Sequence, residues 1–220
     1  MRAPLFAFRC GLFRSGIFCY NINIYAIVHR GERGGFSMNA FSEDTIAAIS
    51  TPVAAGGIGM VRISGPQALE VADWVFRSVS GKQVQQTEGY RGLYGRVHDG
   101  QGEIDEAVVF VYRAPKSYTG ENVAEICCHG GVYLVQRTLR ACIAAGARPA
   151  QAGEFTRRAF LNGKMSLTQA EAVMDLIASQ GQQSAQAALQ AKDGAVFSKI
   201  HQVIDRMLSI SSALAAWVDY

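Results

Sequence analysis

The chain changes character within one stretch, Gly153-Glu-Phe-Thr-Arg-Arg-Ala-Phe-Leu-Asn-Gly-Lys-Met-Ser-Leu-Thr-Gln-Ala-Glu-Ala172. Short β-branched segments alternate with helical patterns before this stretch, and no strand pattern follows it. The stretch also carries Glu154, Arg157, Arg158 and Lys164 just ahead of a helix start. Such a density of bidentate donors and acceptors is typical of a pocket that binds a polar ligand.

The part of the chain before this stretch predicts a mixed α/β domain. Helices are expected from Pro66 towards Gly81 and over residues 132–145, and a hairpin turn is expected at Asp99-Gly-Gln-Gly102. In the strand over residues 104–113 the apolar residues are continuous, so both of its faces are candidates for burial. The expected strands cover residues 44–50, 57–63, 90–98, 104–113 and 123–128.

The part of the chain after this stretch predicts helices alone. Ser166-Leu-Thr-Gln169 has the pattern of a capping box, and glycines at 181 and 194 separate helical segments. An apolar stripe then runs from Val196 to Val218 without a stop signal, and such a stripe needs a partner. The expected fold class is therefore α+β, with a mixed-sheet domain followed by an incomplete all-α helical bundle.

The first residues differ in composition from the rest. Residues 1–37 hold five arginines and one glutamate, a charge of +4, whereas the remainder holds 16 basic and 17 acidic residues. A broad electrostatic surface for nucleic acid is therefore not expected on the folded part. We interpret residues 1–41 as a poorly structured leader, either an upstream extension with Met38 as the natural start or a transit peptide. Its longest uncharged run is too short and too polar to span a membrane.

The five cysteines have no spacing that predicts a metal site, and we expect free thiols in a reducing cytoplasm. Gly56-Gly-Ile-Gly59 and Gly163-Lys-Met-Ser166 both miss residues that nucleotide-binding loops require, so no nucleotide site is predicted. His129-Gly-Gly131 could form an oxyanion hole only beside a nucleophile elbow, and the sequence has none.

Two charged residues lie inside apolar strand patterns. Arg62 lies within residues 58–63 and Glu125 within residues 123–128. A charge on the covered side of a sheet needs a partner, since an unpaired buried charge is very costly. One interpretation is therefore an ion pair between Arg62 and Glu125, with Lys164 as a third member. The other is a ligand that carries groups of both signs.

Three blocks of the sequence, in this order, resemble the tRNA modification GTPase family MnmE (also called TrmE). The resemblance runs from about residue 44 to residue 220. The blocks are Asp44-Thr-Ile-Ala-Ala-Ile-Ser-Thr-Pro52 with Gly56-Gly-Ile-Gly-Met-Val-Arg-Ile-Ser-Gly65, then Ala114-Pro-Lys-Ser-Tyr-Thr-Gly-Glu-Asn-Val-Ala-Glu-Ile-Cys-Cys-His-Gly-Gly131, then the stretch that begins at Gly153.

The resemblance implies a tetrahydrofolate-binding-like domain over residues 42–160, which also forms a homodimer. Residues 161–220 would be the first part of a helical domain, with the GTPase domain and its GTP, Mg and K sites absent from this chain. It further implies a 5-formyl- or methylene-tetrahydrofolate bound at Arg62, Glu125 and Lys164. Glu125 would recognise the pterin. No residue is predicted to be catalytic.

The activity that the resemblance implies is a 5-aminomethyl-type modification of the wobble uridine of tRNA in the cytoplasm. The folate would donate the one-carbon unit, and an FAD-dependent partner, MnmG (GidA), would act with the protein. Two alternatives remain at this point. One is an autonomous folate-dependent aminomethyltransferase, and the other is a non-enzymatic interaction module in which residues 62, 125 and 164 are only structural.

Overall fold

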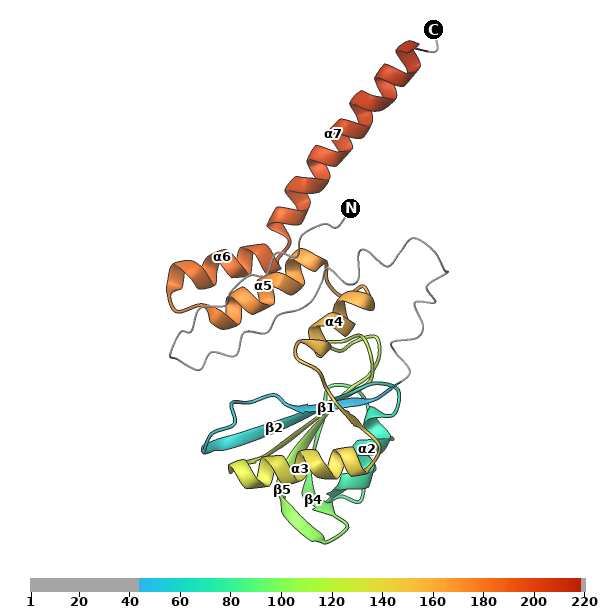
Figure 1. Ribbon diagram of the computed structural model, residues 1–220. Helices are drawn as coiled ribbons and strands as arrows, with labels where there is room; N and C mark the ends of the chain where they lie inside the picture. Colours follow the sequence, from blue (N-terminus) through green and yellow to red (C-terminus); the bar gives the residue numbers. More distant parts are fainter. Residues whose placement is uncertain (1–43, 219–220) are drawn as a thin grey trace, which may run out of the picture. The chain divides into compact units, whose positions relative to one another are not determined.

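A computed structural model describes residues 44–218, apart from the side chains of residues 195–197 and 218. The leader predicted over residues 1–41 lies outside the described residues. The described part contains a seven-stranded sheet with the strand order β3-β4-β5-β6-β2-β1-β7 (Figure 1). Its strands are β1 (Ile46–Ile49), β2 (Gly56–Ser64), β3 (Phe76–Ser78), β4 (Arg91–Asp99), β5 (Gly102–Tyr112), β6 (Val123–Gly130) and β7 (Arg148–Pro149).

The sheet is mixed, which confirms the predicted α+β class. The short edge strand β7 runs parallel to β1, and the other neighbouring strands pair antiparallel. Asp99 and Gly102 face each other where β4 meets β5, at the predicted hairpin turn. The pairing of β2 with β6 places Arg62 directly opposite Glu125. Directly opposite residues of antiparallel strands project from the same face, so these two charges share one side of the sheet.

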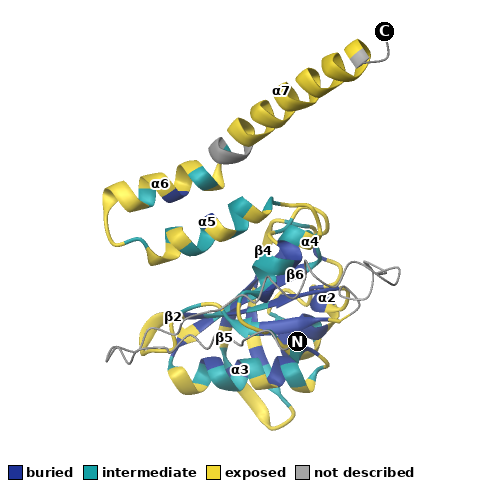
Figure 2. Cartoon of the chain, turned by 45° about the horizontal axis from the view of Figure 1, so that its top comes forward, coloured by how far each residue is buried: buried dark blue, intermediate teal, exposed yellow. Residues whose placement is uncertain are grey.

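One face of the sheet is covered by the helices α2 (Ala68–Val75) and α3 (Val132–Ala144). The core lies between these helices and the sheet (Figure 2). Val61, Ile126 and Val109 from the three central strands are fully buried there. Gly59 allows close packing of α3, because a Cβ at this position would lie 2.1 Å from Val135 Cγ2. The buried side chains of each strand thus follow the period of two.

The opposite face of the sheet is only partly covered. Phe110 and Tyr94 are exposed there, and Met60, Arg62 and Glu125 are half-buried. The expectation that both faces of the strand 104–113 could be covered was therefore wrong for Phe110. The continuous apolar run of this strand does not show whether both of its faces are buried or whether one apolar face is open to solvent.

The first helix is shorter than predicted. The periodic apolar residues suggested that it would continue to Gly81, but α2 ends at Val75 and the chain enters β3 at Phe76. Phe76 pairs with Val97 of β4 and is buried in the core, so tertiary pairing decided the conformation of this segment. Periodicity alone could not reveal that partner.

The described residues after β7 form four helices, α4 (Glu154–Leu161), α5 (Leu167–Ala178), α6 (Gln182–Lys192) and α7 (Ala195–Val218). The predicted capping box is present, since the Ser166 hydroxyl accepts the Gln169 amide and the Gln169 side chain accepts the Ser166 amide. Large apolar side chains of α7 such as Ile204, Met207 and Leu214 are exposed (Figure 2). The predicted domain boundary near residue 161, and the expectation that the bundle is incomplete, stay predictions.

Candidate functional site

Arg62 and Glu125 form an ion pair on the partly covered face of the sheet. The Arg62 Nε donates a hydrogen bond to Glu125 Oε1 at 2.8 Å. The two side chains retain 26% and 13% of their exposure, so the pair is screened from water without being sealed from it. Lone pairs on both carboxylate oxygens remain, because each oxygen can accept two hydrogen bonds.

Tyr112 on β5 completes the surroundings of Glu125. Its hydroxyl donates to Glu125 Oε2 at 3.3 Å, so each carboxylate oxygen has one internal donor. Burial, and then the negative charge of Glu125, raise the pKa of Tyr112, so this phenol keeps its proton at neutral pH. The Tyr112 hydroxyl therefore donates to Glu125 over the whole physiological pH range. Sequence reasoning did not identify Tyr112, because its alternation with buried valines indicated only a packing role.

Two aromatic rings lie beside the guanidinium of Arg62. The Arg62 Cζ atom is 5.6 Å from the ring centroid of Tyr118 and 5.6 Å from that of Phe155. Tyr118 belongs to the loop between β5 and β6, and Phe155 belongs to the first turn of α4. A cation over an aromatic face at this distance is attracted by the ring quadrupole. The two rings were also missed from sequence, because loop and helix are distant along the chain.

Lys164 lies at the edge of this arrangement. Its ammonium donates to the Pro115 carbonyl at 3.1 Å, and its stem lies beside Gly120, where an added Cβ would be 3.2 Å from Lys164 Cγ. Among the contacts of the described residues, Lys164 makes no ion pair with Glu125. The ion pair predicted between Arg62 and Glu125 is thus confirmed, whereas Lys164 is joined to the loop that carries Tyr118.

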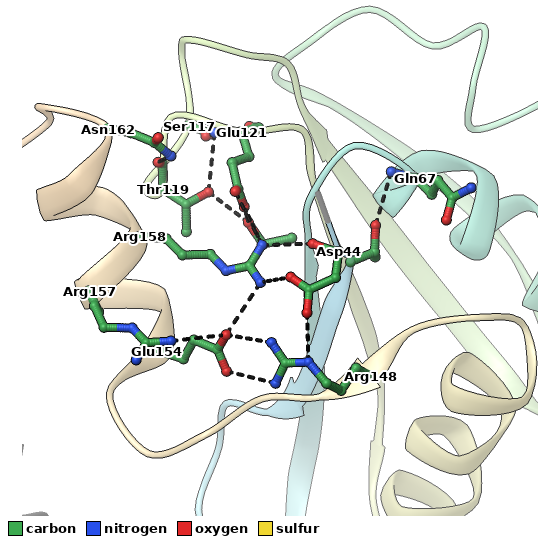
Figure 3. Close-up of polar contacts among 12 residues, drawn as sticks. Asp44, Gln67, Ser117, Thr119, Glu121, Arg148, Glu154, Arg157, Arg158 and Asn162 are labelled. Atoms are coloured by element: carbon green, nitrogen blue, oxygen red, sulfur yellow. Dashed lines mark hydrogen bonds and ion pairs between the residues drawn. The ribbon is translucent and has the colours of Figure 1, made fainter. Parts of the chain in front are cut away.

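A partly buried ionic cluster consists of Asp44, Glu121, Arg148, Glu154 and Arg158 (Figure 3). Arg158 is 3% exposed and donates to the Asp44 carbonyl at 2.8 Å and to Glu121 Oε1 at 3.2 Å. Its Nη2 also pairs with the Asp44 carboxylate and, at 3.3 Å, with Glu154 Oε1. The cluster therefore joins the start of β1, the loop before β6 and helix α4.

Arg148 closes the cluster from the other side. It binds Glu154 through two hydrogen bonds, of 2.7 and 3.1 Å, and Asp44 through its Nε at 2.7 Å. Burial works against the charge of Glu154, but the hydrogen bonds from Arg148 and from the Gln151 amide outweigh it and lower the pKa of Glu154. Burial likewise opposes the charge of Asp44, and hydrogen bonds from Arg148 and Arg158 lower its pKa below the ordinary value. The carboxylates are held ionised by their partners.

This cluster accounts for much of the charge density in the stretch over residues 153–172. Glu154 and Arg158 are one helical turn apart, so they project from the same face of α4, and this face points into the cluster. The charges are thus engaged in internal ion pairs, and the prediction that they mark a ligand pocket was wrong for these two residues. Sequence reasoning missed Asp44 and Glu121, since neither lies near α4 along the chain.

The remaining candidates do not add to the site. The His129 ring bonds Asp105 at 2.8 Å, and this contact raises the pKa of His129. Cys127, Cys128 and Cys142 are free thiols, as predicted, and burial raises the pKa of Cys142 to about 12. No cluster of metal-ligating side chains occurs within residues 44–218.

Two observations concern the helices. A recess between α5 and α6 is lined mainly by alanines, with Asp175 as its one charged lining residue, and contains none of the three predicted binding residues. A search of the described residues found no helix that is long and apolar enough to cross a membrane.

The described residues form an α+β domain that has a charged pair on the partly covered face of its mixed sheet and is followed by helices. Comparison of the sequence with known families then identifies the family. The family described as "GTP-binding protein TrmE N-terminus" matches residues 45–164, more than half of the chain. The chain belongs to this family, as the resemblance predicted. All residues of the pair and its aromatic neighbours lie within the matched span.

Curated relatives of the chain carry the name tRNA modification GTPase MnmE. The chain is 46% identical over 187 residues to the tRNA modification GTPase MnmE of Synechococcus elongatus, which covers 83% of this chain and 40% of that protein. It is 42% identical to the protein of that name from Clostridioides difficile, over 82% of this chain and 39% of the relative. The chain is 45% identical to the protein of that name from Geobacillus kaustophilus, over 80% of this chain and 39% of the relative. The chain thus spans about two fifths of the length of these relatives.

Proposed function

We propose that this chain is the N-terminal part of a tRNA-modifying GTPase and that its own task is to bind a reduced folate. The observation that carries the folate proposal is the half-buried Arg62–Glu125 pair beside two aromatic rings. The names of the relatives support the tRNA-modifying GTPase as the whole-protein activity. Within it, the chain would supply the folate-binding domain and the homodimer contact.

The residues at the pair suit the chemistry of a tetrahydrofolate. A pterin presents adjacent N–H donors to a carboxylate, and Glu125 has lone pairs free for them. Arg62 uses only its Nε in the bonds among the described residues, which leaves two terminal nitrogens for a carboxylate or carbonyl of the ligand. Lys164 is exposed and bonds the Pro115 carbonyl of the loop that carries Tyr118, and we assign it to the glutamate tail of the ligand. Aromatic rings at such a site suit a planar ligand.

The bound folate would supply a one-carbon unit for the 5-aminomethyl-type modification of the wobble uridine. In the whole protein this step would take place with the FAD-dependent partner MnmG and with GTP hydrolysis. We assign to the present residues the binding and orientation of the 5-formyl- or methylene-tetrahydrofolate, and no catalytic step.

Isothermal titration of the full chain with 5-formyl-tetrahydrofolate tests this proposal. Glu125→Gln keeps the shape of the side chain but removes its charge. Because a hydrogen bond to a charged group contributes about 1.5–3 kcal/mol, this variant should bind about 10- to 100-fold more weakly. Arg62→Lys and Lys164→Ala should also weaken binding.

Glu103→Gln is the matched control. Glu103 forms an exposed ion pair with Arg96 at 2.9 Å at the other end of the sheet. We expect the Glu103→Gln variant to bind the folate with the same affinity as the parent. A folded parent chain that does not bind the folate at all, or a Glu125→Gln variant with unchanged affinity, would favour the structural role of the pair.

Urea unfolding of the same chain, with and without the folate, gives a second and independent measurement. A ligand that is present at one hundred times its Kd stabilises the folded state by about 2.7 kcal/mol. The parent and the Glu103→Gln control should show this gain, and the Glu125→Gln variant should lose about half or more of it. A GTP-hydrolysis assay on the same chain should show no activity, whereas an autonomous aminomethyltransferase should form its product with the folate alone.

A further inference from the structure

The Arg62 guanidinium is held between an anion and two aromatic rings that come from different segments. Its Nε is bonded to Glu125, and its Cζ lies 5.6 Å from the ring centroids of both Tyr118 and Phe155. Glu125 comes from β6, Tyr118 from the loop between β5 and β6, and Phe155 from α4. Three separate elements therefore converge on one cation.

Core packing does not account for the two rings. Tyr118 retains 37% of its exposure, and Phe155 is also only half-buried. Arginine side chains have several rotatable bonds, and holding one in a single geometry has an entropic cost. Ring faces that attract the guanidinium reduce the number of geometries that it samples. The rings consequently favour the orientation in which Nε meets Glu125 and the terminal nitrogens remain available.

The two rings are themselves fixed, because the loop and α4 are tied together at several points. The Tyr118 hydroxyl and the Thr156 hydroxyl are 2.9 Å apart, and Asn162 donates to the Thr119 carbonyl at 2.8 Å. Gly120 has a left-handed backbone with φ +80°, which brings the loop against α4. The ionic cluster adds the pair of Arg158 with Glu121.

We propose that Tyr118 and Phe155 are positioning residues that hold Arg62 in the geometry needed by the ligand, a role that rests on the folate site proposed above. Because the geometry is present before the ligand arrives, the ligand does not bear the entropy cost of ordering Arg62. The rings act through Arg62, so their removal should affect both the mobility of Arg62 and the affinity for the ligand.

Nuclear magnetic resonance of the full chain tests this role through the exchange of the Arg62 Nε proton with water. The variants are Phe155→Leu and Tyr118→Leu, which remove one ring each while keeping an apolar side chain. Tyr118→Phe keeps the ring and removes only the hydroxyl. Trp74→Leu is the control, because Trp74 is a 68% exposed aromatic residue on α2, whereas the rings over which Arg62 lies are those of Tyr118 and Phe155.

Each leucine variant should accelerate the exchange of the Arg62 Nε proton and should weaken binding of 5-formyl-tetrahydrofolate by about two- to fivefold, the range expected for one cation–π contact. Tyr118→Phe should retain the slow exchange and most of the affinity, and Trp74→Leu should match the parent. Exchange that is unchanged in both leucine variants would overturn the proposal, whatever the affinities are.

The two measurements separate this proposal from the folate proposal. If the variants show the expected exchange pattern but the parent chain does not bind the folate, the folate proposal is refuted and the positioning of Arg62 by the rings is supported. If the parent chain binds the folate and both leucine variants exchange and bind like the parent, the folate proposal is supported and the positioning role of the rings is refuted. Amide spectra of each variant show whether the fold is retained.

Discussion

Replacement of Arg158 by methionine is the sharpest test of how α4 is attached to the sheet. Methionine has a similar length and is apolar, so Arg158→Met removes the charge and the donors with little change in volume. The substitution breaks the contacts of Arg158 with Asp44, Glu121 and Glu154. It leaves Glu154 and Glu121, which are 1% and 10% exposed, with fewer cations around them, whereas Asp44 is 47% exposed.

The expected loss follows from the partners that remain. Removing one member of a buried ion pair destabilises a protein by about 3–5 kcal/mol, because the other charge stays buried. Here Arg148 still binds Asp44 and Glu154, and the Ser64 hydroxyl still donates to Glu121 at 2.7 Å. We therefore expect the lower end of the range, a loss of about 3 kcal/mol.

Urea unfolding at neutral pH, followed by circular dichroism, measures this loss. With a slope of about 2 kcal/mol per molar urea, the midpoint should fall by about 1.5 M. Arg140→Met is the control, since Arg140 is exposed on α3 and its replacement should change the free energy of unfolding by less than about 0.5 kcal/mol. A midpoint for Arg158→Met within error of the control would refute the reasoning that this cluster attaches α4.

Three further predictions concern other parts of the domain. The pKa values of Asp44 and Glu154 are lowered in the folded state, so their contribution to stability is present above the unfolded values of 3.8 and 4.5 and is lost as the pH falls through the folded values. Urea midpoints should fall in this acidic window, and a flat profile there would contradict the assignment. Gly59→Ala should lower the free energy of unfolding by about 1–3 kcal/mol, because its methyl group would overlap Val135, and an unchanged midpoint would argue against close packing of α3. Ser166→Ala should destabilise the start of α5 by about 1 kcal/mol, seen as faster hydrogen exchange of the Gln169 amide, and unchanged exchange would show that the cap is dispensable.

The positions of most strands and helices could be predicted from the sequence. Alternation of apolar residues marked β2 and β6, and the turn residues after Asp99 marked the hairpin. The capping box at Ser166 marked the start of α5 to the residue. These signals are local, because they depend on backbone sterics and on hydrogen bonds over a few residues.

The candidate site could be predicted in part. An arginine and a glutamate inside apolar strands required an explanation, and the ion pair that was one of the two explanations is present. The third predicted residue, Lys164, bonds the Pro115 carbonyl instead of joining the pair. Tyr112, Tyr118 and Phe155 gave no signal, because an aromatic residue in a strand, a loop or a helix is most simply read as packing.

The sequence by itself determined the class of the fold, the order of its elements and the family, because periodicity, turn residues and motif order are all properties of the chain in one dimension. Only the tertiary structure decided where the charges of α4 are used. Whether Glu154 and Arg158 face a ligand or an internal ionic cluster depends on Asp44, Glu121 and Arg148, which come close only once the sheet has formed. A charge is stabilised by whichever opposite charge lies within a few ångströms, and sequence separation does not reveal that distance.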